Sequence, residues 1–205
     1  MRVSETVVPT EGARMTESLF WPGRRALVLG CDSPLGCGVV QAVVANGGAV
    51  SVFASELPAD SPFIQRRLYE SSSVVRGSWD DLGPLQRLLA VHEIDTIITC
   101  DPQHITTHRL LRTVATARPD ATVTVACDGR SGTLPTFRTS ATNGLRVAFV
   151  RWPNWGDAHE AATLHRAVAA LLDATEAIAR IDAIPVNGLW SAIPMMGNDS
   201  ARKVA

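Results

Sequence analysis

From Arg25 onward the chain alternates short apolar runs, rich in β-branched residues, with longer segments in which apolar residues recur every three or four positions. The short runs predict buried strands and the periodic segments predict helices. The predicted strands are Ala26–Leu29, Val50–Phe53, Ser73–Val75, Thr96–Thr99, Thr122–Cys127 and Arg146–Val150. The predicted helices are Leu35–Asn46, Gly83–His92, Ile105–Ala117 and Ala158–Arg180. Strands that alternate with helices favour a parallel sheet in one compact α/β domain.

The pattern divides the chain into three segments. Residues 1–22 are polar and mixed, so we expect a flexible N-terminal arm, and residues 23–157 hold the α/β domain. Residues 158–205 are expected to form a last helix and a tail. One face of that helix is apolar, through Ala161, Leu164, Val168, Leu171, Thr175 and Ile178. The face either packs on the parent sheet or pairs with a second copy of the chain or with a larger enzyme partner.

Composition narrows the class of protein. The 205 residues carry 19 basic and 20 acidic side chains, a formal charge of −1, and the arginines are scattered, so we expect no nucleic-acid partner. No apolar stretch approaches the length of a membrane span and the start lacks a signal-peptide core, so we expect no membrane contact and a cytoplasmic protein. The four cysteines stand singly in apolar segments, which indicates reduced, buried thiols.

The most informative segment is the turn after the first predicted strand, Gly30-Cys31-Asp32-Ser33-Pro34-Leu35-Gly36. Gly30 allows a sharp turn, Gly36 lets the following helix approach the strand, and the amides at the helix start can hold a pyrophosphate. This is the pattern of the first unit of a Rossmann-like, doubly wound sheet. A turn of this kind also occurs in α/β proteins that bind nothing there.

The segment resembles the short-chain dehydrogenase/reductase superfamily, in particular its extended, nucleotide-sugar epimerase/dehydratase-like branch. The turn matches that branch's GxxGxxG pattern with Ser33 in place of the middle glycine. Residues 75–82 resemble its VxGDxxDxxxL segment, and residues 144–157 resemble its sixth strand and the RxxNxxG exit. The resemblance covers roughly residues 25–157 and implies NAD or NADP as the cofactor.

By this resemblance the cofactor-binding residues are Gly30, Cys31, Ser33, Pro34, Leu35, Gly36, Ser55 and Ser78. The acid that holds the NAD ribose at the end of the second strand is absent, because Ala54 or Ser55 stands there, and Glu56 replaces it only if the register slips. Arg66 and Arg67 either bind the 2′-phosphate of NADP or lie on a solvated helix face. The choice between NAD and NADP therefore stays open.

The family's catalytic pair is missing. A tyrosine followed four residues later by a lysine moves the proton in the family, whereas the only tyrosine here is Tyr69 and the only lysine is Lys203. Only about eighteen residues separate the fifth and sixth predicted strands, too few for the helix that carries the pair. We therefore name no catalytic residue, although Asp128 or His104 could act as an unconventional acid or base.

Two further groups have competing interpretations. Asp101, His104 and His108 have metal-ligand spacing but lack a further ligand, so we expect no metal. Cys31 is either a small buried residue that fits the turn or a redox-sensitive thiol whose pKa the helix amides lower.

The sequence thus predicts a degenerate relative of the family that binds NAD or NADP and acts as a non-catalytic binding, regulatory or partner subunit. The alternative is an active NAD(P)-dependent oxidoreductase or epimerase with unconventional catalytic residues. We expect Gly36→Val to abolish such activity and to spare the fold.

Overall fold

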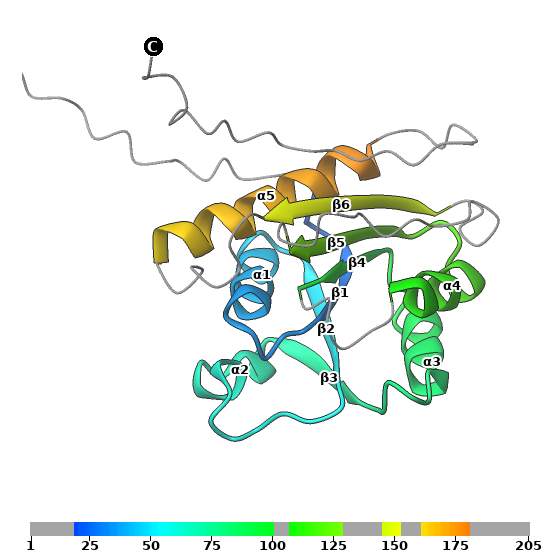
Figure 1. Cartoon of the computed structure of the whole chain (residues 1–205), viewed down its shortest axis with the longest axis horizontal. Coiled ribbons are helices and arrows are strands. Elements are labelled where there is room, and N and C mark those ends of the chain that lie inside the picture. Colours follow the sequence, from blue (N-terminus) through cyan, green and yellow to red (C-terminus); the bar gives the residue numbers. More distant parts are fainter. Residues whose placement is uncertain (1–18, 101–106, 129–144, 153–160, 181–205) are drawn as a thin grey trace, which may run out of the picture.

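Six parallel strands form one sheet in the order β3-β2-β1-β4-β5-β6, as Figure 1 shows. This computed structural model describes residues 19–100, 107–128, 145–152 and 161–180. The strands are β1 (Arg25–Leu29), β2 (Ala49–Ala54), β3 (Ser72–Arg76), β4 (Thr96–Thr99), β5 (Thr122–Asp128) and β6 (Arg146–Trp152). All six match predicted strands to within two residues at each end, because short apolar runs with no polar face suit strands that are covered on both sides.

The strand order reverses between β1 and β4, which are neighbours in the sheet although β2 and β3 separate them along the chain. Leu29 at the end of β1 pairs with Phe53 of β2 on one side and with Thr99 of β4 on the other. This order is that of the Rossmann fold, and it confirms the predicted doubly wound α/β sheet. In such sheets ligands bind beyond the carboxyl ends of the strands at the point of reversal.

Helices cover both faces of the sheet. The helices are α1 (Pro34–Ala45), α2 (Pro62–Gln65), the 3-10 turn η1 (Leu68–Glu70), α3 (Gly83–Val91), α4 (Thr107–Ala117) and α5 (Ala161–Ala179). Figure 1 shows α1 and α5 on one face and α3 and α4 on the other. The short elements α2 and η1 are not among the predicted helices. Within the described residues, no helix combines the length and the apolar character needed to cross a membrane.

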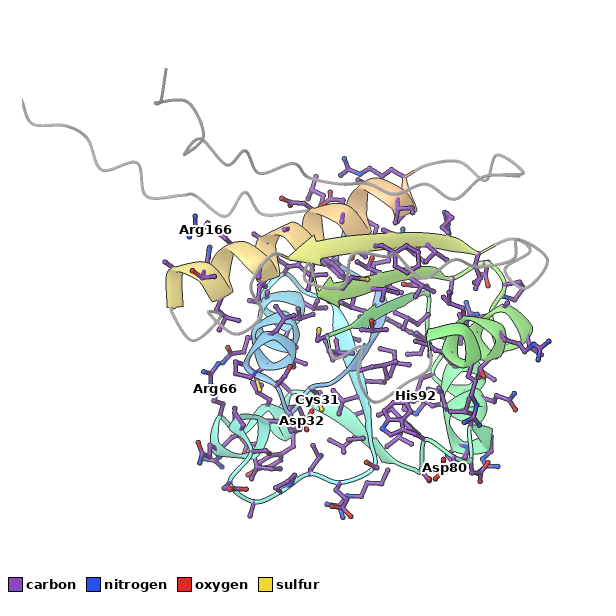
Figure 2. The ribbon with its side chains drawn as sticks, in the orientation of Figure 1. Cys31, Asp32, Arg66, Asp80, His92 and Arg166 are labelled. Carbon is purple, nitrogen blue, oxygen red and sulfur yellow. The ribbon has the colours of Figure 1, made fainter. Side chains whose placement is uncertain are left out.

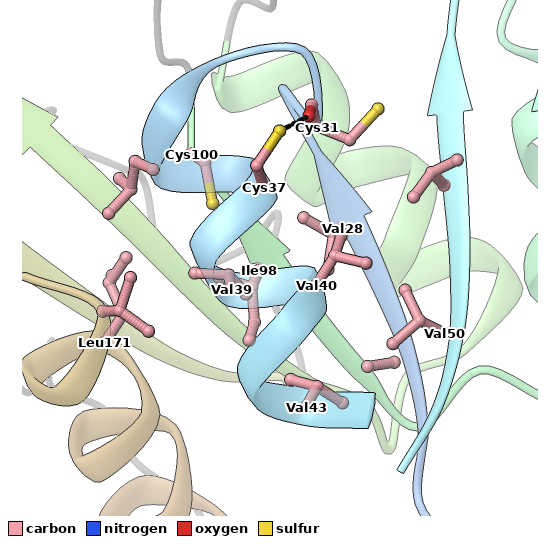
Figure 3. Packing of buried hydrophobic residues seen from close by; sticks show 14 of the residues in the cluster. Val28, Cys31, Cys37, Val39, Val40, Val43, Val50, Ile98, Cys100 and Leu171 are labelled. Atoms are coloured by element: carbon pink, nitrogen blue, oxygen red, sulfur yellow. Dashed lines mark hydrogen bonds between the residues drawn. The ribbon is translucent and has the colours of Figure 1, made fainter. Parts of the chain in front are cut away.

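Two apolar clusters separate the sheet from its helices. Valine is the most frequent residue of the cluster beneath α1 and α5, the valine cluster, which also contains Cys31, Cys37 and Cys100 (Figure 3). Leucine is the most frequent residue of the cluster beneath α3 and α4, which also contains Phe53 and Phe149. The valine and cysteine side chains of the valine cluster are small, which lets α1 lie close to the sheet, and this closeness shapes the turn that precedes α1.

The last residues of the segment assigned to an arm belong to the core. Phe20 and Trp21 are buried in the cluster beneath α1, and their rings meet edge to face at a centroid distance of 4.9 Å. The packed part of the chain therefore begins before residue 23. Their burial follows from the hydrophobic free energy of two large aromatic rings, which a rule based on polar composition overlooked.

The apolar face of α5 is covered by the chain itself. Val168, Leu171 and Ile178 are buried, and Leu171 packs in the valine cluster (Figure 3). The Thr175 hydroxyl lies 2.8 Å from the Thr124 hydroxyl of β5, which ties the helix to the sheet. The buried residues of this face agree with the alternative in which it packs on the parent sheet. Association of the chain with a partner stays a prediction.

Candidate functional site

The turn between β1 and α1 is closed by one serine. Gly30 has a φ of 76°, a left-handed conformation that glycine adopts without strain. Ser33 is the N-cap of α1, and its Oγ accepts a hydrogen bond from the Gly36 N–H at 3.0 Å. The same hydroxyl donates to the Gly30 carbonyl oxygen at 2.8 Å. The serine that replaces the middle glycine of the family pattern therefore bridges the first and last glycines.

Gly36 is required by contact with the strand end. A Cβ at this position would lie 2.0 Å from the Gly30 carbonyl oxygen and 2.7 Å from its carbon, both of which are backbone atoms that cannot rotate away. The predicted role of Gly36 in helix approach agrees with this contact. This contact argues against the expectation that Gly36→Val spares the fold, because a side chain here would have to push α1 away from β1.

Few amides at the start of α1 remain available to a ligand. The Ser33 N–H donates to Gly30 and the Cys37 N–H donates to Ser33, at 3.2 and 2.9 Å. Pro34 has no N–H, and the Gly36 N–H is bonded to the Ser33 hydroxyl. Within the described part of the chain, Leu35 is the residue of this first turn whose N–H has no acceptor. A phosphate here would use that amide and would displace or share the Ser33 hydroxyl.

The thiols around the turn are buried and protonated. Burial, with the Asp32 charge as a secondary cause, raises the pKa of the Cys31 thiol to about 12. Burial also raises the pKa of Cys37 to about 11, and its Sγ donates to the Cys31 carbonyl oxygen at 3.1 Å. Because only the thiolate is an effective nucleophile, the structure supports the interpretation of Cys31 as a small buried residue and contradicts the redox-sensitive alternative.

The remaining predicted cofactor residues lie beside the turn. β1 and β2 run in parallel register, so the end of β2 at Ala54 and the exposed Ser55 follow the Leu29–Phe53 pair at the same edge. The Gly77 N–H donates to the Ala54 carbonyl oxygen at 3.2 Å, which brings the segment after β3 to the same place. Ser78 is exposed there, and its Oγ accepts a hydrogen bond from the Asp80 N–H at 3.1 Å. The fold therefore gathers the turn, Ser55 and Ser78 at one edge, and their binding role stays a prediction.

The two arginines weighed for a 2′-phosphate differ in their surroundings. Arg67 is exposed and forms an ion pair with Glu70. Arg66 ends α2, donates to the Gln41 side-chain oxygen of α1 at 3.3 Å, and its charge opposes the rise in the pKa of Cys37. Figure 2 shows Arg66 on the side of the molecule that carries Cys31 and Asp32. Arg66 is therefore the arginine that lies nearer to the turn.

Other candidates lie elsewhere or outside the described residues. Tyr69 is 43% exposed on η1, and Lys203 lies outside the described residues. Also outside it are Asp101 and His104, the side chains of His108 and Asp128, and the exit after Trp152. Among the residues that are described, no group of three or more histidine, cysteine or acidic side chains is placed to hold a metal ion.

A hollow of about 330 Å³ lies at the end of the sheet opposite to the turn, where the strands begin. Arg25, Ser51, Ser73 and His92 line it together with Ala49, Val50 and Val91, and the Ser51 hydroxyl lies 3.2 Å from His92 Nδ1. The sequence analysis did not single out this group. The hollow lies near the amino ends of β1 and β2, whereas parallel sheets of this order bind nucleotides at the carboxyl ends, so we do not assign it to a cofactor.

No protein-family model and no curated protein sequence matches the chain. Solved structures do match. The X-ray structure of Pen from Bacillus thuringiensis is 15% identical, with a TM-score of 0.57 over 76% of this chain. This chain spans 66% of the length of that one. At this identity the likeness shows a shared fold.

Two further structures have lower scores. An NADH-dependent reductase, A1-R′, complexed with NAD is 16% identical over 77% of this chain and 91% of its own, with a TM-score of 0.46. The UDP-glucose 4-epimerase from Brucella ovis in complex with NAD is 14% identical over 62% of this chain and 51% of its own, with a TM-score of 0.48.

Proposed function

We propose that the chain is a degenerate relative of the short-chain dehydrogenases that binds NAD or NADP at the Gly30–Gly36 turn and acts as a non-catalytic binding, regulatory or partner subunit. The observation that carries the proposal is the position of the turn. It lies at the carboxyl end of β1, where the strand order reverses, and it leads into the 12-residue helix α1. A helix start at this place offers an amide and a positive dipole end to a phosphate.

The contact at Gly36 supports the same assignment. α1 approaches β1 so closely that the Gly30 oxygen lies 2.0 Å from where a Gly36 Cβ would be. Close packing of the first helix on the first strand is the third of the three glycine roles in dinucleotide-binding turns. The second role, room for the backbone to approach a pyrophosphate, is the one that Ser33 takes away, so we expect weaker binding than an all-glycine turn provides.

The residues of the whole sequence support the non-catalytic part of the proposal. A tyrosine and a lysine on one helix face cannot form, because the chain has one tyrosine, Tyr69, and one lysine, Lys203, which lie in different segments. Tyr69 precedes β3 and is half-exposed on η1, away from the exits of β4 and β5 where the nicotinamide half of a dinucleotide lies in this fold. Without the tyrosine and lysine of the family, bound cofactor would lack the family's proton donor for hydride transfer to a carbonyl.

The test is native mass spectrometry of the full chain, followed by titration with NAD, NADH, NADP and NADPH. Retention of one dinucleotide, or saturable micromolar binding of any of the four, supports the proposal. Absence of binding to all four at millimolar concentration contradicts it. Cofactor-dependent turnover of a carbonyl or sugar-nucleotide substrate by the pure protein would contradict the non-catalytic part alone.

A pair of variants locates the site. Ser33→Asn and Ser33→Asp have nearly the same shape and both residue types cap helices. They differ in charge and in that only the asparagine amide can donate to the Gly30 carbonyl oxygen, as the serine hydroxyl does. A carboxylate at this position repels a pyrophosphate, and we expect Ser33→Asp to bind at least about tenfold more weakly than Ser33→Asn. Ser61→Asp, at the N-cap of α2, is the matched control and should not change the affinity. Equal affinity of the two Ser33 variants would place the ligand elsewhere.

A further inference from the structure

We propose that Asp32, inside the turn, replaces the missing acid of β2 as the group that binds the ribose hydroxyls on the adenine side, so that the site takes a ribose with a free 2′-hydroxyl and prefers NAD to NADP. The inference rests on the proposed function and goes beyond it, because it assigns a specificity-determining residue and chooses between the two cofactors.

The ends of β1 and β2 place the turn that contains Asp32 at the edge of the sheet where the acid of the second strand would stand. In a dinucleotide-binding sheet the acid at the end of the second strand faces the turn that follows the first strand, and the ribose lies between them. Here β2 ends at Ala54, a residue that is 8% exposed, and Ser55 with its hydroxyl follows. The parallel register pairs Leu29 with Phe53, so the turn begins directly beside that end. Asp32 is the third residue of the turn, two positions beyond Gly30, and therefore belongs to the segment that starts beside the end of β2.

The carboxylate of Asp32 is available. The side chain is exposed, and within the described residues it makes no hydrogen bond and no ion pair. Its charge contributes to the raised pKa of both Cys31 and Cys37, which indicates that it lies close to the start of α1. Figure 2 shows it next to Cys31.

The chemistry of a carboxylate then decides between the cofactors. Two carboxylate oxygens can accept hydrogen bonds from the neighbouring 2′- and 3′-hydroxyls of a ribose, and such charge-assisted bonds are about twice as strong as neutral ones. A 2′-phosphate carries close to two negative charges and removes one of the donors, so the same carboxylate repels it. Arg66 is the cation that works against this preference, but it donates to Gln41 on α1.

The rival residue is Glu56. It is exposed two residues beyond Ala54, and it would serve as the ribose acid if the end of β2 were shifted. The observed register, in which β2 ends at Ala54 beside Arg76 of β3, leaves Glu56 past the strand end. Glu56→Gln is therefore the matched control for Asp32→Asn, since both variants remove one exposed carboxylate near the same edge and neither residue belongs to the core.

The experiment measures the dissociation constants of NAD and NADP for the full-length wild type, Asp32→Asn, Glu56→Gln and Arg66→Gln by isothermal titration, with thermal unfolding as a check of folding. We expect the wild type to bind NAD more tightly than NADP. Asp32→Asn should weaken NAD binding and tighten NADP binding, with a change in their ratio of at least about tenfold, as expected for loss of a charged hydrogen-bond acceptor. Glu56→Gln should leave the ratio unchanged, and Arg66→Gln should weaken NADP alone.

The outcomes separate this inference from the proposed function. If Asp32→Asn raises both affinities by the same factor, Asp32 repels phosphate in general and the inference is overturned, while nucleotide binding stands. A change of ratio in Glu56→Gln but not in Asp32→Asn overturns it in favour of the rival residue. If the wild type binds neither cofactor, both the inference and the proposed function fail.

Discussion

Two helices of this protein begin with the same dipeptide, but they differ in length and in their contact with the sheet. α1 begins at Ser33-Pro34 and α2 begins at Ser61-Pro62, each with serine at the N-cap and proline at the first helical position. In both, the serine Oγ accepts the N–H three residues later, at 3.0 Å from Gly36 and at 3.4 Å from Ile64. α1 then runs for 12 residues and α2 for 4.

The residue whose N–H donates to the N-cap serine explains much of the difference in helix length. Gly36 faces the end of β1, with no room for a Cβ, so α1 lies against the sheet and buries its valines. Ile64 stands at the equivalent position of α2, where the chain tolerates a large, partly buried side chain. Identical local signals start both helices, and contact with a strand makes one of them a candidate phosphate site. The comparison leads to three predictions about stability.

The largest effect on stability is expected at Gly36 and Ile64, whose N–H groups donate to the two N-cap serines. Gly36→Ala should lower the free energy of unfolding by at least about 3 kcal/mol, because the added methyl group meets a backbone carbonyl. Ile64→Ala, at the matched position, should cost no more than about 1 kcal/mol, because its side chain is only partly buried. Urea unfolding followed by circular dichroism measures both. Similar losses for the two variants would refute the distinction between the two helix starts.

The second predicted effect is a dependence of stability on pH. It arises because Cys31 and Cys37 lie on either side of the start of α1, whereas no cysteine lies near the start of α2. The folded thiols have pKa values of about 12 and about 11, whereas an unfolded cysteine has a pKa of about 8.5. Above that value the unfolded chain loses protons that the folded protein keeps, so stability is complete below about pH 8.5 and falls as the pH rises toward 11 and 12. The slope should approach about 1.4 kcal/mol per pH unit for each thiol.

Few other groups change charge in this pH range, because the chain has one tyrosine and one lysine, and Cys100 and Cys127 are present in both the wild type and the double variant described next. Urea unfolding at pH 8, 9 and 10 with a reducing agent should show the decline in the wild type. The double variant Cys31→Ala, Cys37→Ala should show a flatter profile from a lower starting stability. An equally steep profile in the double variant would mean that other groups are responsible.

The smallest effect concerns the caps themselves. Ser33→Ala removes two hydrogen bonds, to Gly36 and to Gly30, and should cost about 1 kcal/mol. Ser61→Ala removes one longer bond from a helix of one turn and should cost less than about 0.5 kcal/mol. Thermal unfolding of both variants tests the order, and a larger loss at Ser61 would reverse the comparison.

Much of the fold was predictable because its signals are local. Thr96–Thr99 is apolar enough to be buried on both faces, and its predicted bounds are the observed ones. The end of α1 near Asn46 was marked by the two glycines that follow. The short α2 was missed because four residues hold no periodicity, although Ser61-Pro62 is a helix-start signal that could have revealed it.

The candidate site was predictable in its place and not in its contacts. The glycines of the turn and the absence of an acid at Ala54 can be read along the chain. The bridge that Ser33 makes between Gly30 and Gly36 depends on how closely α1 approaches β1, and it leaves Leu35 with the free amide of the first turn of α1 among the described residues. The high pKa values of the Cys31 and Cys37 thiols likewise follow from their burial in the folded protein, and neighbouring residues in the sequence do not predict how large these values are.

Local preferences of the chain therefore set the strands, most helix boundaries and the position of the turn, because each depends on a few adjacent residues. Packing decided which face α5 covers, why Gly36 admits no side chain, and why Phe20 and Trp21 belong to the core. These outcomes depend on distances between segments that are remote in sequence, and such distances exist only once the sheet has assembled.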